Sequence, residues 1–338
     1  MAVSSSSGVD HPLLLVLLAD GQLHSGEDLA RELAVSRAAV WKAVQRLRAS
    51  GVEVQALARR GYRLPRAVEL LDARRIGGEL NQRRAAHLRN LELLFQVDST
   101  NTRLLAAAPP PVGMADACLS ELQHAGRGRR GRRWLAPFGS GIAMSVSWTF
   151  GEAAGALSAL SLAVGVALAR ALERAGASGI GLKWPNDIIF QDRKIGGVLI
   201  ELRAEASGPA HVVIGVGVNV FLPETARREI AATGVSVAAA ADACTHAPSR
   251  NLLAGAILDE LLSMLGRFER EGFAAFRDAW RALDVLEGRP ARVLIADRVI
   301  SGTARGVNQE GALLLETGDG VQRFVSGEAS LRMIEGDT

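Results

Sequence analysis

The sequence predicts an α+β protein of three parts: a winged helix-turn-helix over residues 1–66, a mixed-sheet α/β domain over 67–286, and a small SH3-like β-barrel over 287–338. Three observations lead to this prediction. Apolar residues recur at helical spacing in the first part, apolar runs of strand length with two helical stretches fill the second, and short strands separated by turns make up the third. With 338 residues, of which 48% are hydrophobic, the chain can bury a sizeable core.

The first part begins with three short helices. Leu13–Leu18 is an apolar helix, and Ser25 and Ser36 can each cap the start of a further one, because a serine hydroxyl accepts a hydrogen bond from the first unpaired N–H groups of a helix. The third helix is expected to run to about Ala49. A short turn between two helices is typical of a helix-turn-helix, and Ala34, which occupies this turn, is tolerable there if its φ stays negative.

Two short strands, Val52–Leu57 and Gly61–Leu64, follow and form the expected wing. The net charge of +3 lies entirely in residues 1–66, where nine lysines and arginines face six acids, so this part is expected to bind DNA. The residues predicted to contact DNA are Ser36, Arg37, Lys42, Arg46, Arg59 and Arg60. Three-helix modules also mediate protein contacts, and that alternative stays open.

Six apolar runs indicate the strands of the central sheet. They are Leu91–Val97, Ala117–Leu122, Ile142–Phe150, Asp187–Phe190, Gly197–Leu202 and Val212–Val220. Helices are expected at about 157–175 and 250–270, on one face of the sheet, with one or two linker helices within 67–90. The Ala-rich stretch 226–250 has little pattern and is expected to be a mobile loop.

Four short apolar runs separated by turns predict the strands of the carboxyl-terminal barrel. They are Ala291–Ile295, Val299–Val307, Ala312–Glu316 and Val321–Phe324. The longest uncharged run, Ala153–Ala169, falls short of a membrane span and is rich in small residues, so a buried helix is expected there. The two cysteines, Cys118 and Cys244, stand far apart, and no signal-peptide pattern is present, which predicts a soluble protein of the reducing cytoplasm.

Residues 126–134, Gly-Arg-Gly-Arg-Arg-Gly-Arg-Arg-Trp, are the most informative stretch of the chain. Five arginines without an acid cannot lie in an apolar core, because unpaired buried cations are too costly. The interleaved glycines allow the backbone to approach a ligand closely, and each guanidinium matches phosphate or carboxylate oxygens. This arginine loop is therefore expected to wrap a small anion or to grip a nucleic-acid backbone.

Four further pieces accompany the arginine loop. Asp98–Asn101 offers carboxylate, hydroxyl and amide groups after a strand, although alone it would be a helix cap. Lys183–Asp187 contains a proline that forces an extended chain or a turn, and Lys194–Gly197 places a lysine beside two glycines. Gly215–Asn219 is a strand whose glycines allow another element to approach. Two of the three lysines of the chain fall in these pieces, against 36 arginines overall, which favours a specific use of the compact ammonium group.

In this order and at this spacing, the five pieces closely resemble the bacterial biotin–protein ligases, over almost the whole chain. The arginine loop at 126–134, preceded by Gln123, is the most specific motif of that resemblance. The amino-terminal runs Leu23–Glu27 and Val35–Ala39, and Gly61-Tyr62 in the wing, are similar to the bifunctional members, which also repress the biotin biosynthetic operon.

The resemblance implies a reaction in two steps. Biotin and MgATP give biotinyl-5′-AMP and pyrophosphate, and a specific lysine of the biotin carboxyl carrier protein of acetyl-CoA carboxylase then attacks the acyl carbon. ATP and Mg²⁺ are the expected cofactors, with biotin as the substrate. The expected repressor is a homodimer that binds the operator DNA of biotin genes while it holds biotinyl-5′-AMP, and no membrane partner is expected.

The resemblance also implies roles for single residues. The residues implied to be catalytic are Lys194, Arg129 and Arg127. Biotin is expected to contact Ser99, Thr100, Asn101, Gln123, Arg127, Gly128, Arg129 and Lys194. The nucleotide is expected to contact Arg127, Arg129, Arg130, Trp134, Lys183, Asn186, Glu328 and Arg332. Asp187 is the implied Mg²⁺ ligand.

Two departures from the family pattern and three alternatives stay open. His124 stands where a second glutamine is common, and Phe221–Val237 contains no tryptophan to cover the adenine. The chain could be a biotin ligase whose helix-turn-helix does not repress, a lipoate or octanoate ligase of the same fold, or a nucleic-acid-binding regulator in which the arginine loop grips phosphates. The neutral balance of charge in residues 67–338 argues against the last of these.

Overall fold

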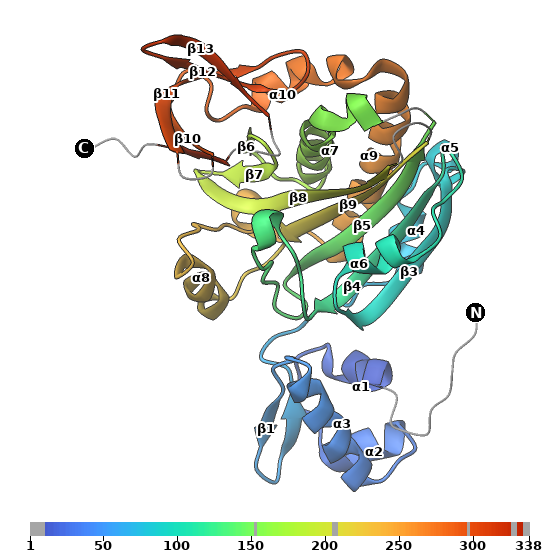
Figure 1. Cartoon of the computed structure of the whole chain (residues 1–338). Coiled ribbons are helices and arrows are strands. Elements are labelled where there is room, and N and C mark those ends of the chain that lie inside the picture. Colours follow the sequence, from blue (N-terminus) through green and yellow to red (C-terminus); the bar gives the residue numbers. More distant parts are fainter. Residues whose placement is uncertain (1–10, 152–153, 205–208, 296–297, 326–329, 334–338) are drawn as a thin grey trace. The chain divides into compact units, whose positions relative to one another are not determined.

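The computed structural model describes residues 11–151, 154–204, 209–295, 298–325 and 330–333. Figure 1 traces the helices and strands along the chain. The chain divides into two compact units, residues 1–71 with 137–139 and residues 72–136 with 140–338. Each unit has a buried apolar core of its own.

The first unit holds three helices and a two-stranded hairpin, as the sequence predicts. These elements are α1 (His11–Leu18), α2 (Gly26–Glu32), α3 (Arg37–Ala49), β1 (Gln55–Leu57) and β2 (Gly61–Arg63). Both predicted caps are confirmed, because the Ser25 hydroxyl accepts from the N–H of Asp28 at 3.0 Å and the Ser36 hydroxyl from the N–H of Ala39 at 3.2 Å. The wing strands have three residues each and are shorter than predicted, since only the residues beside the turn pair.

The turn between α2 and α3 does not meet the condition for an alanine at position 34. Ala34 has a φ of 53°, in the left-handed region, where a residue with a Cβ is unfavourable. The N–H of Ala34 donates to the carbonyl of Arg31 at 3.2 Å, and the N–H of Val35 donates to the carbonyl of Ala30 at 2.9 Å. A helix that ends in such a turn needs a left-handed residue just past its last turn, and glycine usually provides it. The exposed methyl group of Ala34 gains little packing in exchange.

Replacing Ala34 by glycine is therefore expected to stabilise the first unit by roughly 1 kcal/mol, the cost of holding a residue with a Cβ in the left-handed region. Amide hydrogen exchange of α2 and α3 measures this gain locally, as slower exchange of their core amides. Ala38 is the matched control, because it is also exposed but lies within α3, so Ala38→Gly should accelerate exchange. Faster exchange in both variants would show that the turn at Ala34 is not strained.

The second unit is built on a seven-stranded mixed sheet. Its strands are β3 (Leu88–Val97), β4 (Ala115–Gln123), β5 (Gly141–Phe150), β6 (Ile180–Lys183), β7 (Asp187–Phe190), β8 (Arg193–Ala204) and β9 (Ala210–Asn219). Their spatial order is β3-β4-β5-β9-β8-β7-β6, in which β3 and β4 run parallel and the other neighbours run antiparallel. The six predicted strands are confirmed, and β6 is an addition that pairs with β7.

Two long helices, α7 (Leu160–Arg174) and α9 (Arg250–Glu271), pack side by side against this sheet (Figure 1). Alternate residues of β5 point to opposite faces. Phe150 contacts Phe268 of α9, whereas the Ser145 hydroxyl reaches Thr100 at the start of α6 (Thr100–Ala106). The two predicted helices therefore share one face, as expected, and α6 is an additional helix on the opposite face. Three further short helices are α4 (Ala73–Gly78), α5 (Gln82–Ala85) and α10 (Arg277–Leu283).

The stretch 226–250 has defined structure, so the predicted mobile loop is wrong. It contains most of α8 (Glu224–Ala231), and the segment after α8 pairs with the start of β8. The N–H of Lys194 donates to the carbonyl of Ser236 at 2.9 Å, and the N–H of Ala238 donates to the carbonyl of Lys194 at 2.9 Å. Several alanines of this stretch are buried without marking one face of a helix, so a pattern search does not detect its order.

The carboxyl-terminal part is an antiparallel sheet, the predicted SH3-like β domain with one strand added. Its strands are β10 (Pro290–Ile295), β11 (Arg298–Val307), β12 (Leu313–Thr317), β13 (Gly320–Phe324) and β14 (Ser330–Met333). Their order is β13-β12-β11-β10-β14. It is tied to the larger sheet by the indole N–H of Trp184, which donates to the carbonyl of Gly311 at 3.2 Å. Among the described helices, none has both the length and the apolar character of a membrane span.

Candidate active site

A cavity of about 1220 Å³ lies on the face of the large sheet that carries α6. Its wall combines elements that are far apart in the sequence: the start of α6, the arginine loop, the turn between β6 and β7, the first residues of β8, and the segment 229–237. Arg292 and Leu294 of β10 reach it from the carboxyl-terminal sheet. All five pieces that the sequence singles out contribute residues to this one cavity.

Two glycines of β9 allow the floor of the cavity to form. A Cβ on Gly215 would stand 2.3 Å from Oδ1 of Asn101, and a Cβ on Gly217 would stand 2.5 Å from Cε2 of the Trp134 indole. Both distances are far shorter than a van der Waals contact, so a larger residue fits only if α6 or the indole moves. The close approach predicted for the glycines of this strand is confirmed.

A chain of hydrogen bonds fixes the polar side of the floor. The backbone N–H of Thr100 donates to Oε1 of Gln123 at 2.9 Å, and the Thr100 hydroxyl donates to the same oxygen at 3.2 Å. The buried hydroxyl of Ser145 lies 2.6 Å from the Thr100 hydroxyl and 2.5 Å from Oδ1 of Asn101. The amides of Gln123 and Asn101 are thereby held in fixed orientations. Sequence reasoning missed Ser145, because a lone serine in an apolar strand gives no signal.

Ser99 occupies the N-cap position of α6 but does not cap that helix. Its side chain makes no capping hydrogen bond, although the residue is buried and lines the cavity. The N–H of Thr100 goes to the side chain of Gln123 instead. The Ser99 hydroxyl is therefore not a helix cap, and it is placed to contact a ligand in the cavity.

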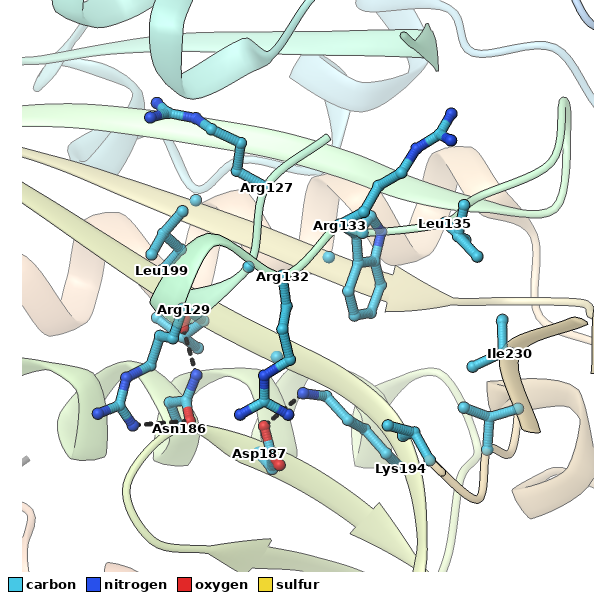
Figure 2. A pocket seen from close by; sticks show the side chains of 18 of the residues that line it. Arg127, Arg129, Arg132, Arg133, Leu135, Asn186, Asp187, Lys194, Leu199 and Ile230 are labelled. Atoms are coloured by element: carbon cyan, nitrogen blue, oxygen red, sulfur yellow. Dashed lines mark hydrogen bonds and ion pairs between the residues drawn. The ribbon is translucent and has the colours of Figure 1, made fainter. Parts of the chain in front are cut away.

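The arginine loop is folded back on itself by its own backbone. The N–H of Gly128 donates to the carbonyl of Arg132 at 2.7 Å, and the N–H of Trp134 donates to the carbonyl of Gly126 at 2.8 Å. A single 3₁₀ turn over residues 129–131 closes the tip, with Arg130 at a φ of 57°. The loop is thus a compact hairpin-like structure, and its guanidinium groups point in different directions (Figure 2).

Arg129 and Arg132 reach down into the cavity, whereas the side chain of Arg127 is turned away from its centre (Figure 2). Nη1 of Arg129 donates to Oδ1 of Asn186 at 3.3 Å. Arg127 instead forms an ion pair with Glu201 of β8 at 2.8 Å. The sequence predicts Arg127 and Arg129 as partners at one catalytic centre; the structure places Arg129 there, together with Arg132, which sequence reasoning did not select.

Lys194 lies beside Arg132 in the cavity (Figure 2). Its Nζ atom donates to Oδ1 of Asp187 at 2.5 Å and stands 5.9 Å from the centroid of the Trp134 ring. Burial, followed by the neighbouring charge of Arg130, lowers the pKa of the Arg129 guanidinium, which stays charged at neutral pH. A ligand that brings negative charge relieves the repulsion among these cations. The site therefore favours an anion.

Asp187, the predicted Mg²⁺ ligand, is paired with Lys194. Within the part of the chain that the structure describes, no three His, Cys, Asp or Glu side chains come together as a metal site. The side-chain oxygens of Asp187 and Asn186 are too few to fill the coordination shell of Mg²⁺. They suit an ion that is also coordinated by phosphate oxygens and by several water molecules.

The other residues predicted to bind the nucleotide are distributed around the cavity. Arg130, Trp134 and Lys183 line it. Arg332 lies in β14, where its backbone is opposite that of Arg292 in β10. Glu328 lies outside the described residues. Sequence reasoning missed Arg292, a cavity-lining residue, because one arginine among 36 gives no contrast.

The segment without tryptophan still supplies an apolar cover. Ile230, Val235 and Val237 line the cavity, and Figure 2 shows Ile230 at the same end as Leu135 of the arginine loop. Aliphatic side chains can cover the faces of a flat ring by burying apolar area. The absence of tryptophan from this segment therefore does not remove the surface that a nucleobase needs.

In the first unit, most of the side chains predicted to contact DNA are exposed. They are Arg37, Lys42, Arg46, Arg59 and Arg60. Ser36 uses its hydroxyl to cap α3. Trp41, which sequence reasoning did not select, is 53% exposed on the same helix. A basic, solvent-exposed helix that follows a tight turn is the arrangement in which helix-turn-helix proteins present their recognition helix.

The fold and the site define a DNA-binding domain joined to a protein ligase domain of the biotin and lipoate kind. Residues 94–219 match the biotin/lipoate A/B protein ligase family. Residues 12–63 match the HTH domain, and residues 288–332 match the biotin protein ligase C terminal domain.

Relatives match this chain over most of its length, and a solved structure matches a large part of it. The chain is 38% identical to the bifunctional ligase/repressor BirA of Salmonella typhimurium over 325 residues, 96% of this chain and 98% of that relative. It is 30% identical to BirA of Bacillus subtilis over 318 residues, 93% of this chain and 95% of that relative. Biotin protein ligase from Aquifex aeolicus, solved in complex with biotin and ATP, has a TM-score of 0.60 and 27% identity, covering 73% of this chain and 100% of that one. The chain belongs to the biotin protein ligase family, in the group of bifunctional ligase/repressors, and the predicted resemblance is confirmed.

Proposed function

We propose that this chain ligates biotin to a lysine of the biotin carboxyl carrier protein of acetyl-CoA carboxylase, in two steps at the cavity, and that it works in the cytoplasm. One observation carries the proposal: Arg129, Arg132 and Lys194 converge beside a polar floor within the same cavity. That combination suits a substrate with a polar ring at one end and a carboxylate that must meet a phosphate at the other.

In the first step a carboxylate oxygen of biotin bonds to the α-phosphorus of ATP, and pyrophosphate leaves with the bridging oxygen. Two anionic groups must meet in line, so fixed cations are needed to lower their repulsion. Arg129, Arg132 and Lys194 fill that role. Asp187 would hold Mg²⁺ once Lys194 turns to the substrate, and the ion, when bound, would supply positive charge beside the phosphates.

In the second step the carrier lysine bonds to the acyl carbon, AMP leaves with its phosphate oxygen, and the amine releases a proton to solvent. Lys194 can follow the negative charge that moves onto the AMP phosphate, because its flexible stem carries a point charge. Arg130, Trp134, Lys183, Asn186, Glu328 and Arg332 are the proposed contacts of the nucleotide.

Ser99, Thr100, Asn101 and Gln123 are the proposed contacts of the biotin ring, together with Gly128 of the arginine loop. Buried hydroxyl and amide groups suit a ring that carries one carbonyl and two N–H groups, because each polar atom needs a partner in a dry site. The fixed amide of Gln123 and the uncommitted N-cap hydroxyl of Ser99 support this assignment.

The chemical test is ligation by the purified full-length chain. The chain is incubated with MgATP and a biotin carrier domain, in one sample with biotin and in another with lipoate. The intact mass of the domain should increase by one biotin in the first sample and stay unchanged in the second. Addition of lipoate, or of neither acid, would overturn the proposed reaction. Omission of the carrier domain should leave biotinyl-5′-AMP bound to the protein.

We further propose that the first unit represses biotin genes, as a homodimer that forms when biotinyl-5′-AMP occupies the cavity. The exposed basic face of α3 supports DNA contact, and two copies match paired half-sites. Gel-shift titration against the chain's own biotin-gene promoter should show binding that strengthens with biotinyl-5′-AMP. Equal binding to unrelated DNA, with or without the adenylate, would overturn the repressor proposal.

Arg46→Ala should weaken that promoter binding and leave ligation unchanged, because Arg46 is exposed on α3 and lies in the first unit. One lost phosphate contact should make the plot of log affinity against log salt concentration less steep, by about 1 in slope for each subunit bound. Arg305→Ala is the matched control, since it removes an exposed arginine from the carboxyl-terminal sheet. An equal loss of slope in both variants would mean that only net charge matters.

A further inference from the structure

One carboxylate joins the floor of the cavity to the arginine loop. Oε2 of Glu201 in β8 accepts from Nδ2 of Asn101 at 2.8 Å and from a terminal nitrogen of Arg127 at 2.8 Å. Glu201 lies 74 residues after Arg127 in the chain, and it was not singled out from the sequence. Its side chain is 24% exposed, so this is a partly buried, charge-assisted contact.

Asn101 carries this connection into the floor. Its Oδ1 atom accepts from the Ser145 hydroxyl at 2.5 Å, while its Nδ2 atom donates to Glu201, so both ends of the amide are fixed. The Thr100 hydroxyl lies 2.6 Å from the Ser145 hydroxyl and can donate to it, while the backbone N–H of Thr100 donates to Gln123 at 2.9 Å. A continuous line of hydrogen bonds therefore runs from the proposed biotin contacts to the arginine loop.

The arginine loop is attached to the sheet at two places. At its end, the Trp134 indole lies against the backbone of Gly217, which has no side chain to hold it away. At its beginning, Arg127 is tied to Glu201. Between them, Arg129 and Arg132 extend from the tip into the cavity (Figure 2). Because Arg127 is turned away from the centre, its pairing with Glu201 supports the loop rather than the reacting atoms.

We propose that Glu201 is a positioning residue: by holding Arg127 and Asn101 together, it keeps the arginine loop closed over biotinyl-5′-AMP until the carrier lysine arrives. This inference rests on the proposed function. A loop that loses this attachment still carries Arg129 and Arg132, so it still supports adenylate formation. It opens more often, and the activated acid escapes into solvent.

The experiment measures how long the adenylate stays with the protein. Biotinyl-5′-AMP is formed from biotin and MgATP without a carrier domain, and the fraction that remains bound is followed by gel filtration over time. Glu201→Leu should accelerate release roughly tenfold, the effect of losing a charge-assisted hydrogen bond at a partly buried site. Glu201→Gln keeps an acceptor without the charge and should give a smaller increase. The rate of adenylate formation should change less than the rate of release.

A second ion pair of the same unit serves as the control. Glu92 of β3 pairs with Arg103 of α6 at 2.8 Å, and the side chains are 25% and 49% exposed, against 24% and 42% for Glu201 and Arg127. Glu92→Leu removes an equivalent carboxylate outside the cavity, so it should leave adenylate release unchanged. Thermal unfolding of both variants separates a general loss of stability from an effect on the loop.

Arg127→Gln should accelerate release as Glu201→Gln does, and the double variant should be no worse than the single ones, because the two residues act through one contact. Retention in Glu201→Leu equal to that in the wild type and in Glu92→Leu would overturn the inference. Failure of the wild type to form any adenylate would overturn the proposed function instead.

Discussion

Lys194→Ala is expected to lose ligation by roughly a thousandfold, because removal of one preorganised donor from a dry site costs 10²–10³ in rate. The Nζ atom of Lys194 is held by Asp187 at 2.5 Å, in the cavity that Arg129 and Arg132 enter. Without Lys194, one cation fewer lowers the repulsion between the biotin carboxylate and the α-phosphate of ATP. Single-turnover assays of adenylate formation and of transfer to the carrier domain measure the loss in each step.

Lys194→Arg should restore little of this activity. The compact ammonium group of Lys194 donates to Asp187 at 2.5 Å, and a planar guanidinium fork does not reproduce this point charge. Arg193→Ala is the matched control, since Arg193 is the preceding residue of β8, pairs with Gln191, and does not line the cavity. Ligation that survives in Lys194→Ala at more than a tenth of the wild-type rate would remove Lys194 from the mechanism.

The sequence predicts most of the fold because its local signals agree with the packing. Ser25 and Ser36 cap the helices that they were expected to cap, and the apolar runs become strands of one sheet. The elements that escaped detection have weak local signals. β6 has only four residues, and the order of the stretch after α8 depends on main-chain bonds to Lys194, which a pattern of side chains does not reveal.

The composition of the site could be predicted better than its geometry. The arginine loop and residues 99–101 line the same cavity, as their resemblance to one family implies. Which arginine points inward depends on the hairpin-like path of the loop, and this path sends Arg127 to Glu201 and Arg132 into the cavity. Glu201 gives no signal of its own, because its partners come from two distant segments.

Gly217→Val is the second variant with a large expected effect: biotin binding should weaken by roughly fiftyfold or more. The Cβ of any residue at 217 would stand 2.5 Å from Cε2 and 2.7 Å from Cζ2 of Trp134, so the indole must leave its place on β9. Overpacking of this kind costs about 1–3 kcal/mol, and the displaced ring also pulls the end of the arginine loop away from the sheet. Isothermal titration with biotin, and with biotin in the presence of MgATP, measures the loss.

The sheet itself gives no reason for such a loss, because valine has a higher strand propensity than glycine. The free energy of unfolding of Gly217→Val, measured by thermal unfolding, should therefore change less than its free energy of biotin binding. Combining Gly217→Val with Trp134→Ala removes the clash, so the double variant should bind biotin no worse than Trp134→Ala alone, and the two effects should not add. Additive losses would show that Gly217 acts on the strand rather than through the indole, and the arginine loop would then need an attachment other than Trp134 at its carboxyl end.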